Sequence, residues 1–351
     1  MAVAVSEVAV SRRPVWGKRA RATINSLVAI ILALLVGAIF ISIAGASPLP
    51  AYRSLVSGSV GSEFAIGQTL IQAVPLLVIG LGLALAFRAR VYNIGADGQF
   101  YLGALAAGAV AIGLPGTFGP LLIVISLIAG ALAGGFWGWI VGFLRARWAV
   151  NVVISSLLLS YIATYIFTYV IRRPLRDSTA SGLLGKGIPD AAQLPLVSGF
   201  GVHIGLFIAL LLVPIVGYVM TRTPFGFRVR MLGMNPDAAQ TTGVNSGRLI
   251  IVLMVISGGL AGLAGAIQLA GVADRLDPTL SNGYGFTAIV VALLGRLSAT
   301  GVLLAALFLG ALNAGGQAMS INDDVPYAVV LAIQGVFVIF LLVADRLARG
   351  R

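Results

Sequence analysis

The sequence predicts an all-α membrane protein that crosses the bilayer about ten times, with both chain ends on the cytoplasmic side. Three observations predict this fold class. First, 59% of the 351 residues are hydrophobic and only 10% are charged, whereas about a quarter of a soluble domain is charged. Second, apolar runs of roughly 20 residues recur along the chain. Third, basic residues gather in alternate connections between these runs.

The apolar runs define the expected spans. A helix needs about 20 residues to cross roughly 30 Å of hydrocarbon, and most of the runs reach that length. The third, eighth and ninth are short or interrupted by glycine, which leaves the number of spans open by one or two. The expected spans are 24–44, 64–87, 99–114, 120–144, 149–171, 202–220, 249–270, 286–295, 300–317 and 326–344.

The first expected span imitates a cleaved signal peptide. Basic residues precede its apolar run, and the small residues Ala44, Gly45 and Ala46 follow it. However, the run has about twenty residues, more than the ~7–15 of a signal-peptide core. We therefore expect a retained helix, with a cytoplasmic tail at 1–20 and a membrane domain at 21–351.

The basic residues orient the chain. With the N-terminus inside, 17 of the 23 Lys and Arg residues lie on the cytoplasmic side, and most acidic residues lie outside. Topology thus explains the net charge of +12, and we expect no nucleic-acid partner. The cytoplasmic set is Arg12, Arg13, Lys18, Arg19, Arg21, Arg88, Arg90, Arg145, Arg147, Arg222, Arg228, Arg230, Arg248, Arg296, Arg346, Arg349 and Arg351.

The longest polar stretch on the cytoplasmic side, 221–248, predicts two short helices lying along the membrane surface. Thr223 before Pro224 is a helix start with its cap, and Asn235 before Pro236 is a second one. Such a segment is either an amphipathic connector resting on lipid headgroups or a docking element for a cytoplasmic partner. The apolar residues at helical spacing are Phe225, Val229 and Leu232, with Arg228 and Arg230 off this stripe.

Three blocks of sequence resemble signatures of bacterial ABC-transporter permeases for nucleosides and simple sugars. Tyr92–Gln99 reads YNIGADGQ and is similar to the family's FNIGAEGQ. Asn151–Ile162 reads NVVISSLLLSYI and is similar to NEVITTLMLNYI. Gly283–Thr287 and Ala292–Arg296 together are similar to GYGF followed by ALLGR. The resemblance covers roughly residues 65–345.

A fourth block resembles the EAA…G loop through which ABC permeases dock into a groove of the ATPase subunit. Asp237-Ala238-Ala239 is followed by Gly243, with Asp in place of the usual Glu. Two other departures from the family signatures are Val152, where the family has Glu, and Ser160, where it often has Asn. The resemblance implies these ATPase-docking residues: Arg228, Arg230, Asn235, Pro236, Asp237, Ala238, Ala239 and Gly243.

The resemblance also implies an assembly. A chain of this family has an ABC importer permease fold of about ten spans in the bacterial cytoplasmic membrane. It forms a pore with a second homologous permease, binds ATPase subunits inside and receives solute from an external binding protein. The external loop 172–201 carries Arg172, Arg173 and Arg176 against the charge rule. These arginines would meet acidic residues of the binding protein or sit at lipid headgroups.

Polar side chains within the expected spans are candidate contacts for the solute, because a polar solute needs hydrogen-bonding partners inside the membrane. Such residues are also candidates for bonds between helices. If the loop around Asp97 re-enters the membrane, it either lines a cavity or is buried in protein. Most of the set are amides or aromatics, which suits a neutral polar solute. The candidates are Gln72, Asn93, Asp97, Gln99, Asn151, Ser155, Tyr284, Phe286 and Asn313.

The sequence offers no catalytic apparatus. The chain has no cysteine and one histidine, His203, so we expect no metal site. Gly185-Lys186 is not a P-loop, because Ala180 and Gly187 stand where the motif requires Gly and Ser or Thr. We therefore expect no cofactor on this chain, with ATP and Mg²⁺ bound by the partner ATPase.

The expected function is that of a permease subunit in an ATP-driven importer for nucleosides or related small polar solutes. Simple sugars and branched-chain amino acids stay open as alternative solutes. An ion-coupled secondary transporter is a further alternative, but the expected spans lack the carboxylate pair on which such coupling usually relies.

Overall fold

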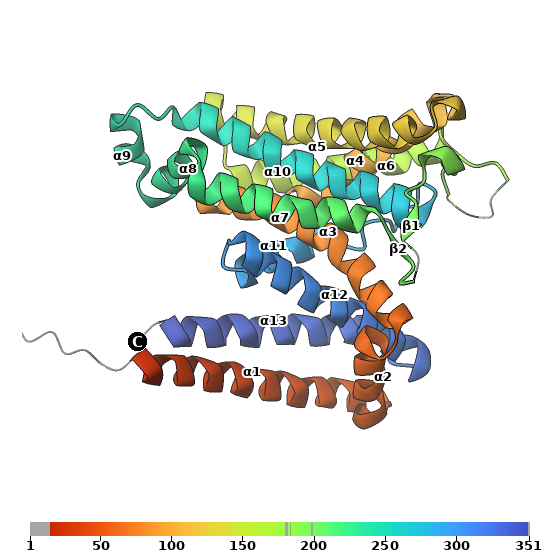
Figure 1. Cartoon of the computed structure of the whole chain (residues 1–351), viewed down its shortest axis with the longest axis vertical. Helices are drawn as coiled ribbons and strands as arrows, with labels where there is room; N and C mark the ends of the chain where they lie inside the picture. Colours follow the sequence, from red (N-terminus) through yellow and green to blue (C-terminus); the bar gives the residue numbers. More distant parts are fainter. Residues whose placement is uncertain (1–14, 180–181, 183, 198, 350–351) are drawn as a thin grey trace, which may run out of the picture.

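The computed structural model describes residues 15–179, 182, 184–197 and 199–349, which form a bundle of long helices (Figure 1). Within this part of the chain, seven helices are long and apolar enough to cross a membrane, or up to eight if one bent pair is a single span. The all-α class is confirmed. The seven are α3 (Glu63–Arg88), α5 (Pro120–Trp148), α6 (Val152–Arg172), α7 (Gly205–Arg222), α10 (Ser246–Gln268) with its π-helical continuation η3 (Leu269–Ala273), α12 (Ala299–Asn322) and α13 (Tyr327–Arg349).

The bent pair includes the first expected span, 24–44, which lies almost entirely in its first helix. α1 (Val15–Ile43) begins inside the segment that we expected to be a tail, whose residues 1–14 lie outside the described part. It leads into α2 (Pro48–Val60), a helix that the sequence analysis did not predict, through a bend of 116°. The Tyr52 hydroxyl donates to the carbonyl of Leu34 at 2.6 Å and so ties α2 to α1.

Two of the three weak spans are helices that fall outside these seven. α4 (Ala96–Gly113) has 18 residues and α11 (Tyr284–Leu294) has 11, or about 27 Å and about 16 Å of helix. Non-helical chain precedes each of them, at 91–95 and at 274–283. The third weak span is complete, because α12 has 24 residues. The span count therefore depends on α4 and α11.

Small residues let the central helices touch through their backbones. A Cβ added at Gly134 of α5 would collide with the carbonyl oxygen of Gly258 and lie 2.7 Å from the Cα of Gly262, both on α10. Helices that gain no hydrophobic drive from lipid associate through such close approaches. α3 occupies the middle of the bundle, and 83% of its apolar 18-residue stretch is buried. α1 and α13 lie side by side at one edge (Figure 1).

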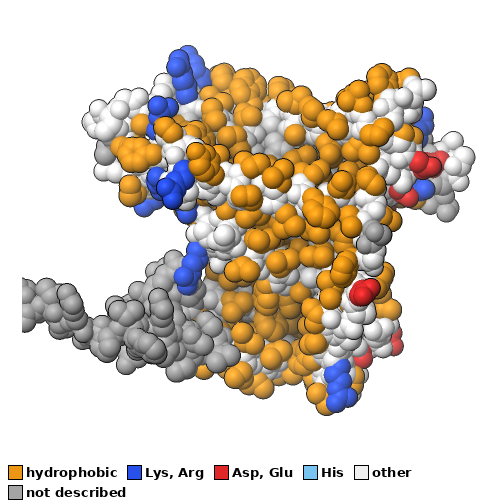
Figure 2. Space-filling model, in the orientation of Figure 1, with side chains coloured by type: hydrophobic (Ala, Val, Ile, Leu, Met, Phe, Trp, Pro, Cys, Tyr) orange, Lys and Arg blue, Asp and Glu red, His pale blue; other side chains and the backbone are white. Residues whose placement is uncertain are grey.

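The connections gather on two sides. On the face shown in Figure 2, most basic side chains lie at one end of the hydrophobic belt, and the acidic ones lie at the other end together with a few basic ones. The external loop is tied to the chain before α11, since Gly185 N–H donates to the carbonyl of Leu276 at 2.8 Å. The remaining short elements are η1 (Gly116–Phe118), η2 (Asp190–Ala192), the antiparallel pair β1 (Leu196–Val197) and β2 (Val202–His203), α8 (Pro224–Met234) and α9 (Pro236–Thr241).

Candidate functional site

α8 is held against the cytoplasmic end of α3. The Thr223 side chain accepts a hydrogen bond from the Gly226 N–H at 3.1 Å and caps the helix, as its sequence predicts. A Cβ at Gly233 would collide with the carbonyl oxygen of Arg88, so α8 packs on the last turn of α3. The apolar residues predicted to face inwards are buried or half-buried: Phe225, Val229 and Leu232.

α9 carries the EAA-like block, at the end of the bundle that the charge pattern predicts to be cytoplasmic. The Asn235 side chain accepts from the Asp237 N–H at 3.0 Å, so the predicted start of this helix is confirmed. Ala239 is fully buried, whereas Asp237 and Gly243 are exposed. Gly243 has φ +82°, which residues with a Cβ rarely adopt, and it ends the helix. The side chain of Ala238 lies outside the described residues.

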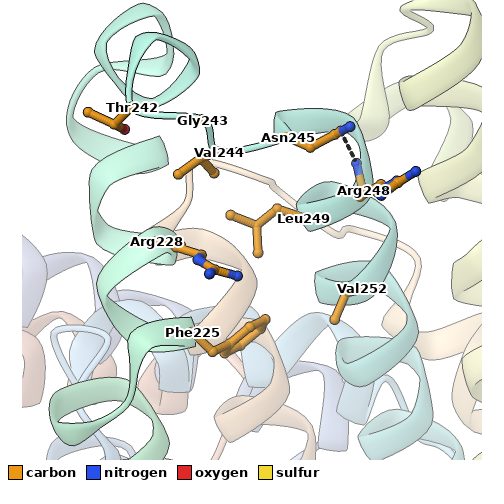
Figure 3. A pocket seen from close by; sticks show the side chains of 9 residues that line it. All are labelled: Phe225, Arg228, Thr242, Gly243, Val244, Asn245, Arg248, Leu249 and Val252. Carbon is orange, nitrogen blue, oxygen red and sulfur yellow. Dashed lines mark hydrogen bonds between the residues drawn. The ribbon is translucent and has the colours of Figure 1, made fainter.

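The surface beside α8 and α9 is basic and hollowed. A pocket of about 370 Å³ lies between α8 and the start of α10, and Arg228 extends into it near Phe225 and Leu249 (Figure 3). Arg230 instead donates to the carbonyl of Met220. Among the side chains described at this end of the bundle, one carboxylate is exposed, that of Asp237. The surface therefore suits an acidic partner.

The starts of α4 and α11 meet at Asp97, which lies in the first turn of α4. Its carboxylate accepts hydrogen bonds from the hydroxyl of Ser281 and from the N–H of Gly285, the latter at 3.1 Å. Gly285 belongs to the first turn of α11. One buried carboxylate therefore caps α11 and lies at the positive end of both helix dipoles.

The segment before α4 re-enters the bundle. Asn93 and Gln99 are fully buried, and the Asn93 amide donates to Gln99 at 2.8 Å and to the hydroxyl of Ser257 at 3.0 Å. Ser257 lies eleven residues after Ser246, hence about 16 Å along α10 from its cytoplasmic start. Non-helical backbone therefore lies well inside the bundle, where it is covered by protein.

Serines of α6 hold the same segment from its other side. The Ser156 hydroxyl accepts from the Ile94 N–H at 3.1 Å, and the Ser160 hydroxyl accepts from the Gly98 N–H at 2.8 Å. Ser160 replaces an Asn of the family signature, and it is 4% exposed. This departure therefore falls at a contact between helices. Four buried serines lie at these breaks, and none of them was among the predicted site residues: Ser156, Ser160, Ser257 and Ser281.

The structure does not bring the remaining candidates together at one place. Tyr284 is buried and its hydroxyl donates to Gln72 on α3. Phe286, two residues further along α11, is 42% exposed. Asn313 is half-buried on α12. Their role in a solute pathway stays a prediction.

Two candidates form the start of α6. The exposed Asn151 accepts from the Val153 N–H at 2.9 Å and caps the helix. The Ser155 hydroxyl donates to the Asn151 carbonyl at 2.9 Å. These bonds give both residues a structural task at the cytoplasmic end of the helix.

The external side holds the one histidine of the sequence. His203 in β2 is fully buried, and burial lowers its pKa to about 4. Among the described residues, no group of three or more His, Cys, Asp or Glu side chains is placed to hold a metal ion. Arg172, Arg173 and Arg176 are exposed, and their partner stays a prediction.

Comparison with known proteins identifies relatives over most of the chain. The family described as "Branched-chain amino acid transport system / permease component" matches residues 65–344. The glucose ABC transporter permease protein of Haloferax volcanii is 35% identical over 92% of this chain and 87% of its own length. The guanosine ABC transporter permease protein NupP of Bacillus subtilis is 35% identical over 92% and 94%. The nucleoside ABC transporter permease protein NupB of Lactococcus lactis is 32% identical over 93% and 92%. The chain therefore belongs to this family of ABC-transporter permeases and is a multi-pass membrane protein.

Proposed function

We propose that this chain is the pore-forming permease subunit of an ATP-driven nucleoside importer. The observation that carries the proposal is the match to two nucleoside-type permeases, guanosine and nucleoside, at 35% and 32% identity over nearly the whole chain. The chemistry of the bundle agrees. Its buried polar side chains are mainly amides and hydroxyls, and the buried carboxylate of Asp97 is already engaged. Such an interior suits a neutral solute.

A simple sugar is the second candidate solute. The Haloferax volcanii relative is a glucose permease and is as similar to this chain as the guanosine permease, at 35% identity. Nucleosides and sugars share a ring that carries several hydroxyl groups, and both are neutral. A branched-chain amino acid is a zwitterion and would need a charged partner of each sign inside the membrane.

The ATPase subunits would dock on α8 and α9. In support, both helices are anchored by buried apolar residues, whereas Asp237, Gly243 and Arg228 are exposed. ATP and Mg²⁺ would bind to these partner subunits. A second, homologous permease would complete the pore, and an external solute-binding protein would deliver the solute.

The contacts of α8 suggest how ATP binding reaches the pore. ATP can drive transport only by binding one conformation of the assembly better than another. Gly233 of α8 packs on the carbonyl of Arg88, and the Arg88 side chain donates to the carbonyl of Leu297 at 2.9 Å. Leu297 lies three residues after the last residue of α11. A displacement of α8 would therefore act on the ends of both α3 and α11.

Uptake by the assembled importer in proteoliposomes tests the proposal. We expect uptake of labelled guanosine that requires ATP on the side of the membrane that carries the ATPase subunits. This uptake should persist when ion gradients are collapsed. Labelled glucose and leucine, measured in parallel, are the matched solutes. Uptake of leucine alone would overturn the choice of solute. Uptake driven by an ion gradient without ATP would overturn the importer class.

A further inference from the structure

A polar pocket opens on the external side, away from the docking surface. It has a volume of about 450 Å³ and lies where α10 passes into η3 and into the non-helical chain before α11. Neither ATPase docking nor helix packing uses it. Its polar lining residues are Gln268, Arg275, Asp277, Thr279 and Asn282.

Gln268 is the buried polar group of this pocket. It is 7% exposed, and it lines the pocket. An amide that lines an open pocket is available to a molecule that enters the pocket.

The backbone around the pocket is locally irregular. Asp274 has φ +53° and Asn282 has φ +43°, although neither is glycine. The π-helical turn η3 begins directly after Gln268. Backbone conformations of this kind cost free energy and gather at binding sites. The irregular chain places the side chains of 275–282 around the opening.

Asp277 offers an oriented carboxylate. One of its oxygens accepts from both the N–H and the hydroxyl of Thr279, each at 2.6 Å. These bonds fix the carboxylate, and its other oxygen is available as an acceptor. Arg275 is paired with the neighbouring Asp274 at 3.3 Å. The pocket therefore combines a carboxylate acceptor, an amide and little net charge.

This lining selects the chemistry of the ligand. A carboxylate accepts hydrogen bonds from hydroxyl groups, and an amide both donates to them and accepts from them. The lining includes no aromatic side chain on which a base would stack. We infer that this pocket binds the polyhydroxylated ring of the solute, a ribose or a hexose, through Gln268 and Asp277. The inference rests on the proposed function and adds a recognition site on the permease itself.

The location gives such binding a direct structural consequence. The pocket is built on the chain 274–283, and the hydroxyl of Ser281 in that chain donates to Asp97. Asp97 in turn caps α11. A ring held by Asp277 would therefore lie on the segment that leads into α11.

Cysteine protection tests the site cleanly, because the native chain has no cysteine. Leu184→Cys places a single thiol at the edge of the pocket, and Ser178→Cys places one on the exposed external loop outside it. The full assembly in proteoliposomes is treated from outside with a membrane-impermeant maleimide. We expect D-ribose and uridine to slow labelling at 184 but not at 178, and uracil to slow neither.

Two variants in the Leu184→Cys background assign the ligands. Gln268→Leu and Asp277→Asn should each raise the half-protecting concentration of ribose about tenfold or more. Asp190→Asn, an external carboxylate outside the pocket, should leave that concentration unchanged. Equal protection by uracil and uridine, or no protection by ribose, would overturn the inference.

Failure of the proposed function is separable from failure of this inference. Uptake of guanosine by the unmodified assembly decides the function, and ribose protection at position 184 decides the pocket. An assembly that imports glucose but not guanosine would still carry the site if ribose or glucose protected the thiol.

Discussion

Single buried side chains hold the breaks in the bundle. Asp97 joins the starts of α4 and α11, and Asn93 joins the re-entrant segment to Ser257 of α10. In a continuous helix, backbone groups are hydrogen-bonded within the helix itself. At these breaks, side chains provide hydrogen bonds instead. Non-helical backbone at membrane depth needs such partners, because lipid offers none. Asp97 and Asn93 therefore have a structural task at the breaks, whether or not they also contact a solute.

His203 makes the stability of the external side depend on pH. Its ring lies between Gly205 and Gly271, where an added Cβ would lie 2.6 Å and 2.5 Å from the ring, and burial lowers its pKa to about 4. The unfolded chain would take up the proton near pH 6.5. The buried neutral ring of His203 makes its full contribution to the free energy of unfolding above pH 6.5. This contribution is lost as the pH falls towards 4. We expect a loss of about 2 kcal/mol at pH 5, from 1.36 kcal/mol per pH unit.

Thermal unfolding in detergent at pH 7.5 and pH 5 measures this effect. His203→Phe removes the titrating group, so the difference between the two midpoints should shrink in this variant. Carboxylates that titrate in the same range contribute equally to both proteins. An identical pH dependence in the variant would show that His203 is not the titrating group.

The paired elements α8 and α9 carry the docking hypothesis. Replacing Asp237 and Gly243 together with Ala removes an exposed carboxylate and strains a turn at φ +82°. We expect the double variant to lose uptake and to lose co-purification with the ATPase, while its membrane insertion stays intact. Contact loss at an exposed surface, rather than unfolding, is the physical reason.

An external pair provides the matched control. Gly201 also has a positive φ, +65°, and an added Cβ there would meet nothing within 4 Å, as at Gly243. Asp190 is a carboxylate on the same external side. Replacing Asp190 and Gly201 with Ala should therefore spare uptake. Unchanged uptake in the Asp237 and Gly243 variant would remove α8 and α9 as the docking element.

Elements whose signals are local were predictable from the sequence. Thr223-Pro224 and Asn235-Pro236 predicted the starts of α8 and α9, because a cap acts within three residues. Ser47-Pro48 carries a similar signal for α2, but we expected no helix between the first two spans, 24–44 and 64–87. Partners such as Ser257 for Asn93 lie far apart in sequence, and no local pattern encodes them.

The molecule as a whole is oriented by charge, and a thiol scan measures this orientation. Thr242→Cys lies by the docking surface and Ser178→Cys lies on the external loop. With no native cysteine to compete, and with the chain expressed without its ATPase partner, an impermeant maleimide should label position 178 in whole cells and label 242 only after permeabilisation. Labelling of 242 in intact cells would reverse the topology.

The glycine contact between α5 and α10 cannot form until both helices have been synthesised. α5 ends at Trp148 and α10 ends at Gln268, so a ribosome that adds ~5–20 residues per second completes α10 about 6–24 s after α5. Throughout that interval, the glycine face of α5 has only lipid, the insertion machinery or earlier helices beside it. The centre of the bundle therefore closes late, once the second half of the chain has emerged, and the insertion machinery must hold or tolerate an unpaired α5 until then.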